Sequence, residues 1–343
     1  MKATYHQYFL HFKTPSGTSR GILTEKETWF IILEENGKKG IGECGLLRGL
    51  SCDDRPDYEE KLKWTCENIH LGEDILWQNL FEFPSIQFGI EMAFQSLKSE
   101  NPFLLFPSDF TKGQKSIAIN GLVWMGNEVY MKQQIDQKIQ DGFHCIKLKI
   151  GAIDFEKELQ LLRYIRRNYS SDQIEIRVDA NGAFDSNTAL VKLEQMSGLE
   201  IHSIEQPIGK NQHDRMSELC KITPIPIGLD EELIGVFSLT EKEDLLLRIK
   251  PQFIILKPSF IGGFRGTKQW IDLANKYQIG WWITSALESN VGLNAIAQWT
   301  FLENNPMPQG LGTGALYTNN FRSPLEIKGG RLYHTSSEWE FSL

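Results

Sequence analysis

The sequence lacks the features that mark several broad classes of protein. No apolar run approaches the roughly 18 residues needed to span a bilayer, and the first residues lack the apolar core of a signal peptide. Positive charge is also in deficit, because the 36 Lys and Arg residues are outnumbered by 44 Asp and Glu residues. Surfaces that bind nucleic acid are usually basic. We therefore expect a cytoplasmic protein that binds neither a membrane nor nucleic acid.

Cysteine is scarce as well, since the chain has only five and no two of them form a Cys-x-x-Cys pair. Neither a zinc site nor a disulfide framework is therefore indicated. No Gly-x-Gly-x-x-Gly motif follows the first strand of the alternating part of the chain, which disfavours a dinucleotide-binding fold. With 343 residues of ordinary globular composition, the chain is long enough for a barrel and one smaller domain.

The pattern up to about residue 105 differs from the pattern that follows. Three strand-like runs are rich in aromatic and β-branched residues, and Asn36-Gly37 between the last two is the strongest short hairpin signal. Two stretches with helical spacing come next. We expect an α+β capping domain over residues 1–110, completed by the C-terminal segment 320–343. Its expected strands are 8–12, 28–34, 38–43, 332–334 and 339–341, and its expected helices are 58–69 and 85–97.

From about residue 115, apolar strand-like runs alternate with helical stretches such as 154–168 and 264–277. Alternation of this kind implies a parallel sheet, and eight units favour a closed barrel over an open sheet. The fold class predicted for residues 111–319 is therefore α/β, as a TIM-like barrel. The expected barrel strands are 117–120, 144–149, 174–179, 201–205, 225–229, 253–257, 280–284 and 309–311.

Three successive strands of this predicted barrel carry an acid at the C-terminal end, namely Asp179, Glu205 and Asp230. In such a barrel the strand ends meet on one face, where the active site lies. Three carboxylates meeting there would repel one another unless a cation lay among them. Oxygen ligands suit Mg²⁺, or Mn²⁺ in its place. Taken singly, each acid could instead be a helix N-cap, although glutamate is a weak one.

Lysines occupy the same level of the barrel. Lys147 and Lys149 are separated by one residue and so point to the same face of a strand, and Lys257 ends a later strand. Exposed lysines are the alternative, but a closed barrel leaves no free strand edge for them. Nearby charges would lower a lysine pKa toward neutrality, which suits a general base. Such a site suits proton abstraction next to a carboxylate, with the enediolate stabilised by the metal.

These groups together resemble the motifs of the enolase superfamily, in its muconate-lactonising branch. The resemblance covers nearly the whole chain. Within that branch, segments 15–21, 119–122 and 283–293 resemble the o-succinylbenzoate synthase family. The matching motifs are Lys147-x-Lys149, Asp179-x-Asn181, Glu205 before Gln206-Pro207, Asp230-Glu231-Glu232, and Lys257 before Pro258.

The resemblance implies a (β/α)₇β barrel under a cap built from both chain ends. It also implies a small anionic substrate, a cyclohexadiene carboxylate with a succinyl arm, which is dehydrated to 2-succinylbenzoate in menaquinone biosynthesis. Lys149 would remove the proton and return it to the leaving hydroxyl, while Lys257 would act as a cation–π partner on the other ring face. The implied Mg²⁺ ligands are Asp179, Glu205 and Asp230.

Four further residues are expected to contact substrate. Lys147 and Asn181 follow from the matched motifs. Arg20 would supply cationic help, with a surface loop arginine as the alternative. Ser285 would hydrogen-bond the succinyl carboxylate, and the helix N-terminus after it could bind an anion, with plain N-capping by Ser285 as the alternative.

Three rival functions differ in their expected residues. N-acylamino acid racemases or epimerases of the same superfamily use both lysines, and related dipeptide epimerases carry Asp-x-Asp where this chain has Gly312-Thr313-Gly314. Acid-sugar dehydratases bring a histidine on the seventh strand, which here has Trp281 and Trp282 instead. These two residues favour an apolar or aromatic ligand, with core packing as the commoner alternative. A non-catalytic scaffold would be expected to lose at least one of the charged groups.

Overall fold

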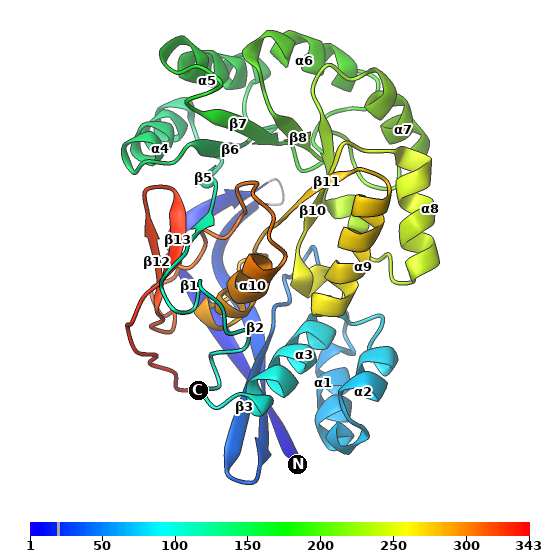
Figure 1. Ribbon diagram of the computed structural model, residues 1–343. Coiled ribbons are helices and arrows are strands. Elements are labelled where there is room, and N and C mark those ends of the chain that lie inside the picture. The colour runs from blue at the N-terminus through cyan, green and yellow to red at the C-terminus, as the bar shows by residue number, and fades with distance from the viewer. Residues whose placement is uncertain (19–20) are drawn as a thin grey trace.

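The computed structural model describes residues 1–18 and 21–343. The N-terminal part begins with an antiparallel sheet of β1 (Lys2–Thr18), β2 (Gly21–Glu35) and β3 (Lys38–Cys44), drawn in blue in Figure 1. The strands are the three predicted ones, although the first two are much longer. The predicted hairpin is present between β2 and β3, where Asn36 and Gly37 both adopt the positive φ angles that a tight Asn-Gly turn requires.

Helices cover one face of this sheet. The predicted helices are confirmed as α1 (Tyr58–Glu67) and α3 (Pro84–Lys98), with the short α2 (Glu73–Asn79) between them. Apolar side chains of β2, among them Trp29 and Ile31, form a common buried cluster with Ile86 and Ile90 of α3. The other face of β2 carries Phe30, which belongs to the core that continues into the rest of the molecule. The sheet thus lies between its own helices and the larger domain.

The larger part is a parallel seven-stranded sheet that curls into a barrel, with helices on its outside (Figure 1). Neighbouring strands follow chain order, as expected for repeated βα units. The strands are β5 (Gly121–Val123), β6 (Cys145–Lys149), β7 (Glu175–Asp179), β8 (Ser203–Glu205), β9 (Ile227–Leu229), β10 (Phe253–Leu256) and β11 (Gly280–Ile283). The helices are α4 (Glu128–Gln140), α5 (Phe155–Asn168), α6 (Ala189–Met196), α7 (His213–Ile222), α8 (Leu239–Ile249), α9 (Gly263–Lys276) and α10 (Asn290–Leu302).

The barrel closes differently from the prediction. Segment 117–120 was expected to be its first strand, but β4 (Ile117–Ala118) pairs antiparallel with the C-terminal β13 (Arg331–His334), and β5 takes the place beside β6. The expected strand 309–311 contributes only two single parallel bridges, Gln309 with Ile119 and Gly310 with Thr284. These bridges join the two ends of the seven-stranded sheet and complete the closure.

The C-terminal segment returns to the N-terminal part, as expected. After the hairpin of β12 (Leu325–Lys328) and β13, Trp339 stacks on Phe103 with 4.2 Å between ring centroids, and Phe341 meets Phe30 edge-on at 5.7 Å. Segment 339–341 is not a strand, since it carries only a single bridge between Glu340 and Arg322. The division at residues 110 and 320 stays a prediction.

In the part of the chain that the structure describes, no helix combines the length and the apolar character needed to cross a bilayer.

Asp53 leads to a prediction about stability and pH. Its Oδ2 atom accepts hydrogen bonds from the Ser85 backbone N–H at 2.9 Å and the Ser85 hydroxyl at 2.6 Å, at the start of α3. Burial raises the pKa of Asp53 to about 6. The folded state therefore holds this proton more tightly than the unfolded chain, whose aspartate pKa is about 3.9. The resulting stability is complete below about pH 4 and is lost as the pH rises to about 6.

Asp53→Asn should remove this pH dependence. The unfolding free energy of the variant minus that of the unmodified protein should rise by up to about 3 kcal/mol from pH 4 to pH 7. Urea denaturation at each pH measures this difference. The matched control is Asp54→Asn. Burial opposes ionisation of Asp54, but the Gly49 N–H and Arg48 outweigh it and lower its pKa, so its effect should have the opposite sign. Equal pH trends in the two variants would contradict the assignment.

Candidate active site

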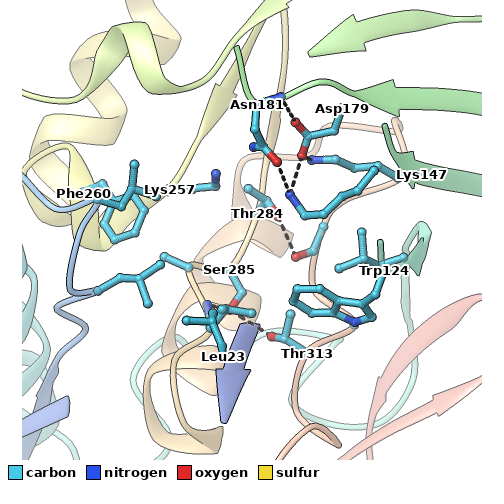
Figure 2. A pocket seen from close by; sticks show the side chains of 18 of the residues that line it. Leu23, Trp124, Lys147, Asp179, Asn181, Lys257, Phe260, Thr284, Ser285 and Thr313 are labelled. Atoms are coloured by element: carbon cyan, nitrogen blue, oxygen red, sulfur yellow. Dashed lines mark hydrogen bonds and ion pairs between the residues drawn. The ribbon is translucent and has the colours of Figure 1, made fainter. Parts of the chain in front are cut away.

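A cavity of about 220 Å³ lies between the β1–β2–β3 sheet and the C-terminal ends of the barrel strands. Figure 2 shows Lys257 and Lys147 entering it from opposite sides, with Phe260 and Trp124 forming part of its walls. Its outer wall comes from the capping sheet and the loop after β3, through Leu23, Leu47, Arg48 and Leu50. The cavity therefore combines an ionic floor at the strand ends with apolar walls.

The parallel register places the predicted acids and lysines in one row. Lys149 pairs with Asp179 across β6 and β7, and Asp179 pairs with Glu205 across β7 and β8. The ammonium of Lys147 lies between the two acids, 3.0 Å from Asp179 Oδ2 and in direct contact with Glu205 Oε2. All three of these side chains are at least nine-tenths buried. Burial here is tolerable because opposite charges meet directly.

The ammonium of Lys149 also makes polar contacts at the C-terminal ends of the barrel strands. It donates to Asp179 Oδ2 at 2.9 Å and to Asn181 Oδ1 at 2.7 Å. The Asn181 backbone N–H donates to Asp179 Oδ1 at 3.1 Å, and its side-chain amide donates to Glu231 Oε1 at 2.9 Å. Asn181 has φ of 44°, a left-handed conformation that asparagine tolerates better than most residues. The turn after β7 thus fixes the position of Lys149.

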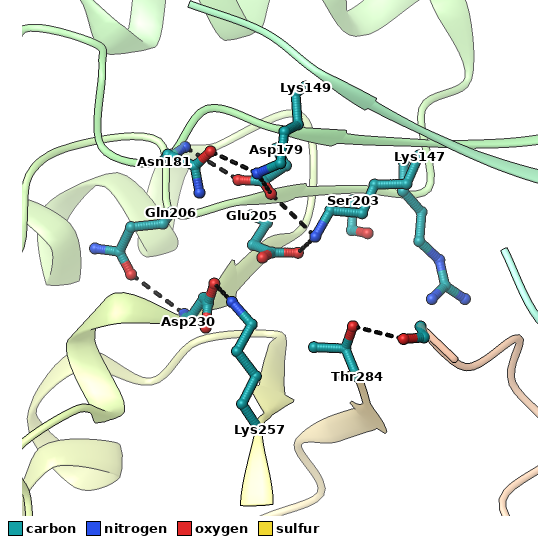
Figure 3. A network of polar contacts seen from close by, with 12 residues as sticks. Lys147, Lys149, Asp179, Asn181, Ser203, Glu205, Gln206, Asp230, Lys257 and Thr284 are labelled. Carbon is teal, nitrogen blue, oxygen red and sulfur yellow. Dashed lines mark hydrogen bonds and ion pairs between the residues drawn. The ribbon is translucent and has the colours of Figure 1, made fainter. Parts of the chain in front are cut away.

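Asp230 and Lys257 form the opposite side of the floor. The two side chains are in direct contact, and the Asp230 backbone N–H donates to Gln206 Oε1 at 3.2 Å. Gln206 in turn donates to Glu232 Oε2 at 3.1 Å. Figure 3 shows Lys149 and Lys257 on opposite sides of the carboxylates. Gln206, next to Glu205, is a supporting residue that the sequence reasoning missed.

The carboxyl groups of the row differ in acidity. Burial opposes ionisation of Asp179, but the neighbouring lysines outweigh it and hold its pKa well below the usual range. Lys257 outweighs burial of Asp230 in the same way and lowers its pKa. Burial, followed by the negative charges of the other two acids, raises the pKa of Glu205 well above its usual value. Glu205 is therefore the acid of this row that takes up a proton most readily.

The expectation of a lowered lysine pKa is wrong for Lys257. Burial alone would lower the pKa of Lys257, but the negative charges of Asp230 and Glu205 outweigh it and raise that pKa. The same balance, with Asp179 as the strongest opposing charge, raises the pKa of Lys147. Both side chains are therefore ammonium groups at neutral pH. The sequence could not show this, because it depends on which acids the fold places in contact with each lysine.

The three acids face lysines in this structure, and their role as metal ligands stays a prediction. Within residues 1–18 and 21–343, no group of three His, Cys, Asp or Glu side chains is arranged to hold a metal ion, because the acids face lysines instead. Two observations nevertheless fit a hard cation. The donor set consists of carboxylate oxygens, and Glu205 Oε1 is buried without a hydrogen bond to any described residue. The N-cap alternative does not hold. The helices after Asp179 and Glu205 begin only at Ala189 and His213, and Asp230, which precedes a short 3-10 helix, makes no capping hydrogen bond with its side chain.

Ser285 lines the cavity but its hydroxyl is already fully used. It donates to Glu288 Oε2 at 2.5 Å and accepts from the Thr313 hydroxyl at 2.9 Å and the Leu287 N–H at 3.1 Å. Donation to a substrate carboxylate would require breaking the bond to Glu288. The contact with substrate stays a prediction, whereas the alternative, N-capping, is wrong, because α10 begins at Asn290 and Ser289 is its N-cap.

The N-terminus of α10, expected as an anion site, already holds a carboxylate of the protein. Glu43 of β3 accepts hydrogen bonds from the N–H groups of Ser289 and Gly292, both at 2.8 Å, and from the Ser289 hydroxyl at 2.5 Å. Thr28 of β2 donates to the same acid at 2.9 Å. Glu43 thus ties the capping sheet to the barrel, a contact between residues about 250 positions apart that no local pattern signals.

Gly292 has no room for a side chain beside this contact. A Cβ there would lie 2.8 Å from Glu288 Cβ and 2.9 Å from Glu43 Oε2. We expect Gly292→Ala to lower the unfolding free energy by about 1–3 kcal/mol, the usual cost of overpacking. Gly198→Ala is the matched control, because nothing lies within 4 Å of its Cβ position. Urea denaturation measures the unfolding free energy of both variants. Equal losses would contradict the conclusion that a side chain at position 292 is crowded.

Arg20 lies outside the described residues. Trp281 and Trp282 do not line the cavity: Trp282 packs inside the barrel under Arg177, 4.2 Å from its guanidinium, and Trp281 is buried with its indole donating to Asn275. The aromatic walls are Trp124 and Phe260, which sequence reasoning missed because neither belongs to a recognisable motif.

A parallel barrel with acids on three successive strands, lysines on opposite sides and a capping sheet above defines an acid–base enzyme of the barrel class. The family description Enolase C-terminal domain-like matches residues 130–337, and MenC, N-terminal domain matches residues 1–97. An o-succinylbenzoate synthase from Desulfotalea psychrophila is 46% identical over 97% of this chain and 98% of its own length. The chain belongs to the enolase superfamily and, within it, to the o-succinylbenzoate synthase family.

Solved structures of related proteins agree with this family assignment. The crystal structure of MenC from Desulfotalea psychrophila superposes with a TM-score of 0.86 at 42% identity and covers 97% of this chain and 99% of that one. A dipeptide epimerase from Cytophaga hutchinsonii, complexed with Mg and the dipeptide D-Ala-L-Val, has a TM-score of 0.82 at 20% identity, over 97% and 93% of the two chains. The second likeness shows the fold alone.

Proposed function

We propose that this chain catalyses the o-succinylbenzoate synthase reaction, a lyase step of menaquinone biosynthesis. Water is removed from 2-succinyl-6-hydroxy-2,4-cyclohexadiene-1-carboxylate to give 2-succinylbenzoate. The observation that carries the proposal is the pair Lys149 and Lys257 on opposite sides of one cavity, in a chain that is 46% identical to an o-succinylbenzoate synthase over nearly its whole length.

The cavity suits a ring with a charged substituent. Its walls of Leu, Trp and Phe side chains can cover an apolar ring, while its floor presents ammonium groups to a carboxylate. Burial in this closed space strengthens the attraction between the ammonium groups and the substrate. A neutral or cationic substrate would lack a partner for these lysines.

The proposed metal ligands are Asp179, Glu205 and Asp230. The buried Glu205 Oε1 atom without a hydrogen bond supports this role, as does the Mg in the related epimerase structure. Bound Mg²⁺ would stabilise the negative charge that develops on the carboxylate oxygens when the adjacent proton leaves.

Lys149 acts as base and then as acid in this proposal. Its Nζ atom in the neutral form takes the proton from the ring carbon that bears the carboxylate, and the electron pair of that C–H bond enters the enediolate. The same ammonium then gives its proton to the leaving hydroxyl, the C–O bond breaks, and water departs as the ring becomes aromatic. One group on one face suffices for both transfers, which makes the elimination syn.

The remaining residues position the reactants. Asn181 and Asp179 hold the Lys149 ammonium at 2.7 and 2.9 Å, so that its proton has a defined direction. Lys257 remains protonated and presents positive charge to the other ring face as a cation–π partner. Lys147 presents an ammonium to the ring carboxylate. Lys257 already lies 5.9 Å from the Phe260 ring, which shows that aromatic carbon can approach it.

The direct test adds the cyclohexadiene substrate and Mg²⁺ to the purified protein and follows the ultraviolet absorbance of the aromatic product. Product formation that chelation by EDTA stops and Mg²⁺ restores would support the proposal. Stable substrate over hours under conditions in which the protein remains folded would refute it.

The two opposed lysines also suit racemisation of an N-acylated amino acid, with a proton taken on one face and returned on the other. NMR in D₂O with N-succinyl amino acids distinguishes the two functions. Fast α-proton exchange without dehydration of the cyclohexadiene would favour the racemase.

A further inference from the structure

Lys26 is a buried lysine that the proposed reaction does not use. It lies on β2 opposite Leu10 of β1, and only 2% of its surface is exposed. Its ammonium nitrogen is buried and makes no hydrogen bond within the described part of the chain. An ammonium in such a place is costly unless nearby charges compensate it. The groups around Lys26 must therefore supply that compensation.

Two buried carboxylates do so. Burial lowers the pKa of Lys26, and the negative charges of Glu43 and Glu288 oppose that effect. Both acids are fully buried, and the side chains of both lie close to the Cβ position of Gly292. Glu27, also on β2, adds a weaker negative charge. Burial raises the pKa of Glu288, and Lys26 is the strongest influence that opposes this rise.

Glu288 connects two loops at the mouth of the barrel. It accepts from the Ser259 hydroxyl after β10, and from the Ser285 hydroxyl at 2.5 Å and the Ala286 N–H at 2.8 Å after β11. An ionised carboxylate accepts all three bonds as they stand, whereas a protonated carboxyl brings an O–H that needs a further acceptor or the reversal of one serine bond. The charge on Glu288 therefore decides how Ser285 and Ser259 are oriented.

The segment held by Glu288 is a wall of the cavity. Ser285, Ala286 and Leu287 all line it, and the Leu287 carbonyl accepts from the Tyr317 hydroxyl at 2.7 Å. Leu287 and Leu23, another lining residue, pack against the buried cluster that contains Leu10, the cross-strand partner of Lys26. Lys26 thus lies one layer of side chains behind the wall.

We propose that Lys26 is a positioning residue of this active site: its buried ammonium compensates the buried Glu288 carboxylate, and Glu288 holds residues 285–287 as the wall against which the substrate binds. The choice of substrate for the test rests on the proposed function. The charged and titratable groups facing this pair are Glu27 on β2, Glu43 on β3 and Tyr317.

Lys26→Met removes the charge and keeps the length of the side chain. KM for the cyclohexadiene should rise about tenfold or more on the acidic side of the pH profile and recover as the pH rises, because a higher pH ionises Glu288 without help, while kcat changes less than about threefold. Lys26→Arg keeps the charge and should leave KM within about threefold of the unmodified protein. Equal rises in KM for the Met and Arg variants would overturn the proposal.

Lys242→Met is the matched control. Lys242 is equally buried, at 1% exposed, but donates only to the neutral oxygens of Gly266 and Gln269 on the outside of the barrel. Its replacement should change stability without changing KM or its pH dependence. A KM shift in this variant similar to that of Lys26→Met would show that loss of any buried lysine disturbs the site, and would refute a specific role for Lys26.

Glu288→Gln completes the experiment. Its KM should be raised at every pH, and the double variant Lys26→Met with Glu288→Gln should be no worse than Glu288→Gln alone. Additive effects would overturn the coupling. The unfolding free energies of the unmodified protein, the two single variants and the double variant, measured by urea denaturation, give this coupling without substrate. Absence of turnover by the unmodified protein would count against the proposed function, whereas normal turnover with independent Lys26 and Glu288 effects would count against the Lys26 proposal alone.

Discussion

Lys149→Ala is expected to lower kcat for dehydration by about 10²- to 10⁴-fold, the range that general acid–base groups contribute. The loss should lie toward the upper end because one group serves both proton transfers. The Lys149 ammonium is held by Asp179 at 2.9 Å and Asn181 at 2.7 Å, so no other lysine can take its place without breaking its own ion pair. Absorbance of the aromatic product under saturating substrate measures the effect.

Measuring the Mg²⁺ affinity of Lys149→Ala shows whether the variant has lost only its base or its whole metal site. Lys149 is not a proposed ligand, so calorimetric Mg²⁺ binding should remain within about threefold of the unmodified protein, since removing its charge only favours a cation. Lys63→Ala, which replaces an exposed lysine on α1, is the control and should retain full turnover. Turnover retained by Lys149→Ala would remove this residue from the mechanism and leave Lys147 or Lys257 as the base.

Asp230→Asn is expected to weaken Mg²⁺ binding strongly. Loss of an outer partner of a metal site typically costs about 10- to 100-fold in affinity, and loss of a direct carboxylate ligand should cost at least as much. The same change removes the partner of Lys257, which then has only more distant negative charges around it. The Mg²⁺ concentration that gives half-maximal rate, titrated from micromolar to tens of millimolar, measures the change.

Asp244→Asn provides the comparison, because this acid lies exposed on α8 away from the cavity. Its Mg²⁺ dependence should equal that of the unmodified protein. An unchanged half-maximal Mg²⁺ concentration in Asp230→Asn would show that the cation binds elsewhere, and the assignment of all three acids would then fail together.

The part of the site that could be predicted follows from periodicity. Strand-like runs recur along the chain, and parallel pairing in chain order then brings Asp179 beside Glu205 and Lys149 beside Asp179. The family resemblance rested on the same strand ends. Strand ends are well signalled because a buried apolar run stops at a charged residue and a turn.

Other features depend on contacts between distant segments. Three such contacts join parts of the chain that lie far apart in sequence. They are the bridges of Gln309 and Gly310 that close the barrel, the antiparallel pairing of β4 with β13, and the hydrogen bonds of Glu43 with the start of α10. The hydrogen-bond partners of Ser285 could not be predicted for the same reason. Its hydroxyl serves Glu288, whose burial against the capping sheet no local pattern reveals.

The direct contacts of Lys147 with Glu205 and of Lys257 with Asp230 have a consequence for how the protein matures in the cell. Because these internal counter-ions already offset the charge of the acids, we expect the polypeptide to fold without a divalent ion. Under the proposed function, metal supply would then change how many molecules are active rather than how many are folded. A culture starved of magnesium should accumulate intact, inactive enzyme that becomes active within seconds of adding the ion to an extract.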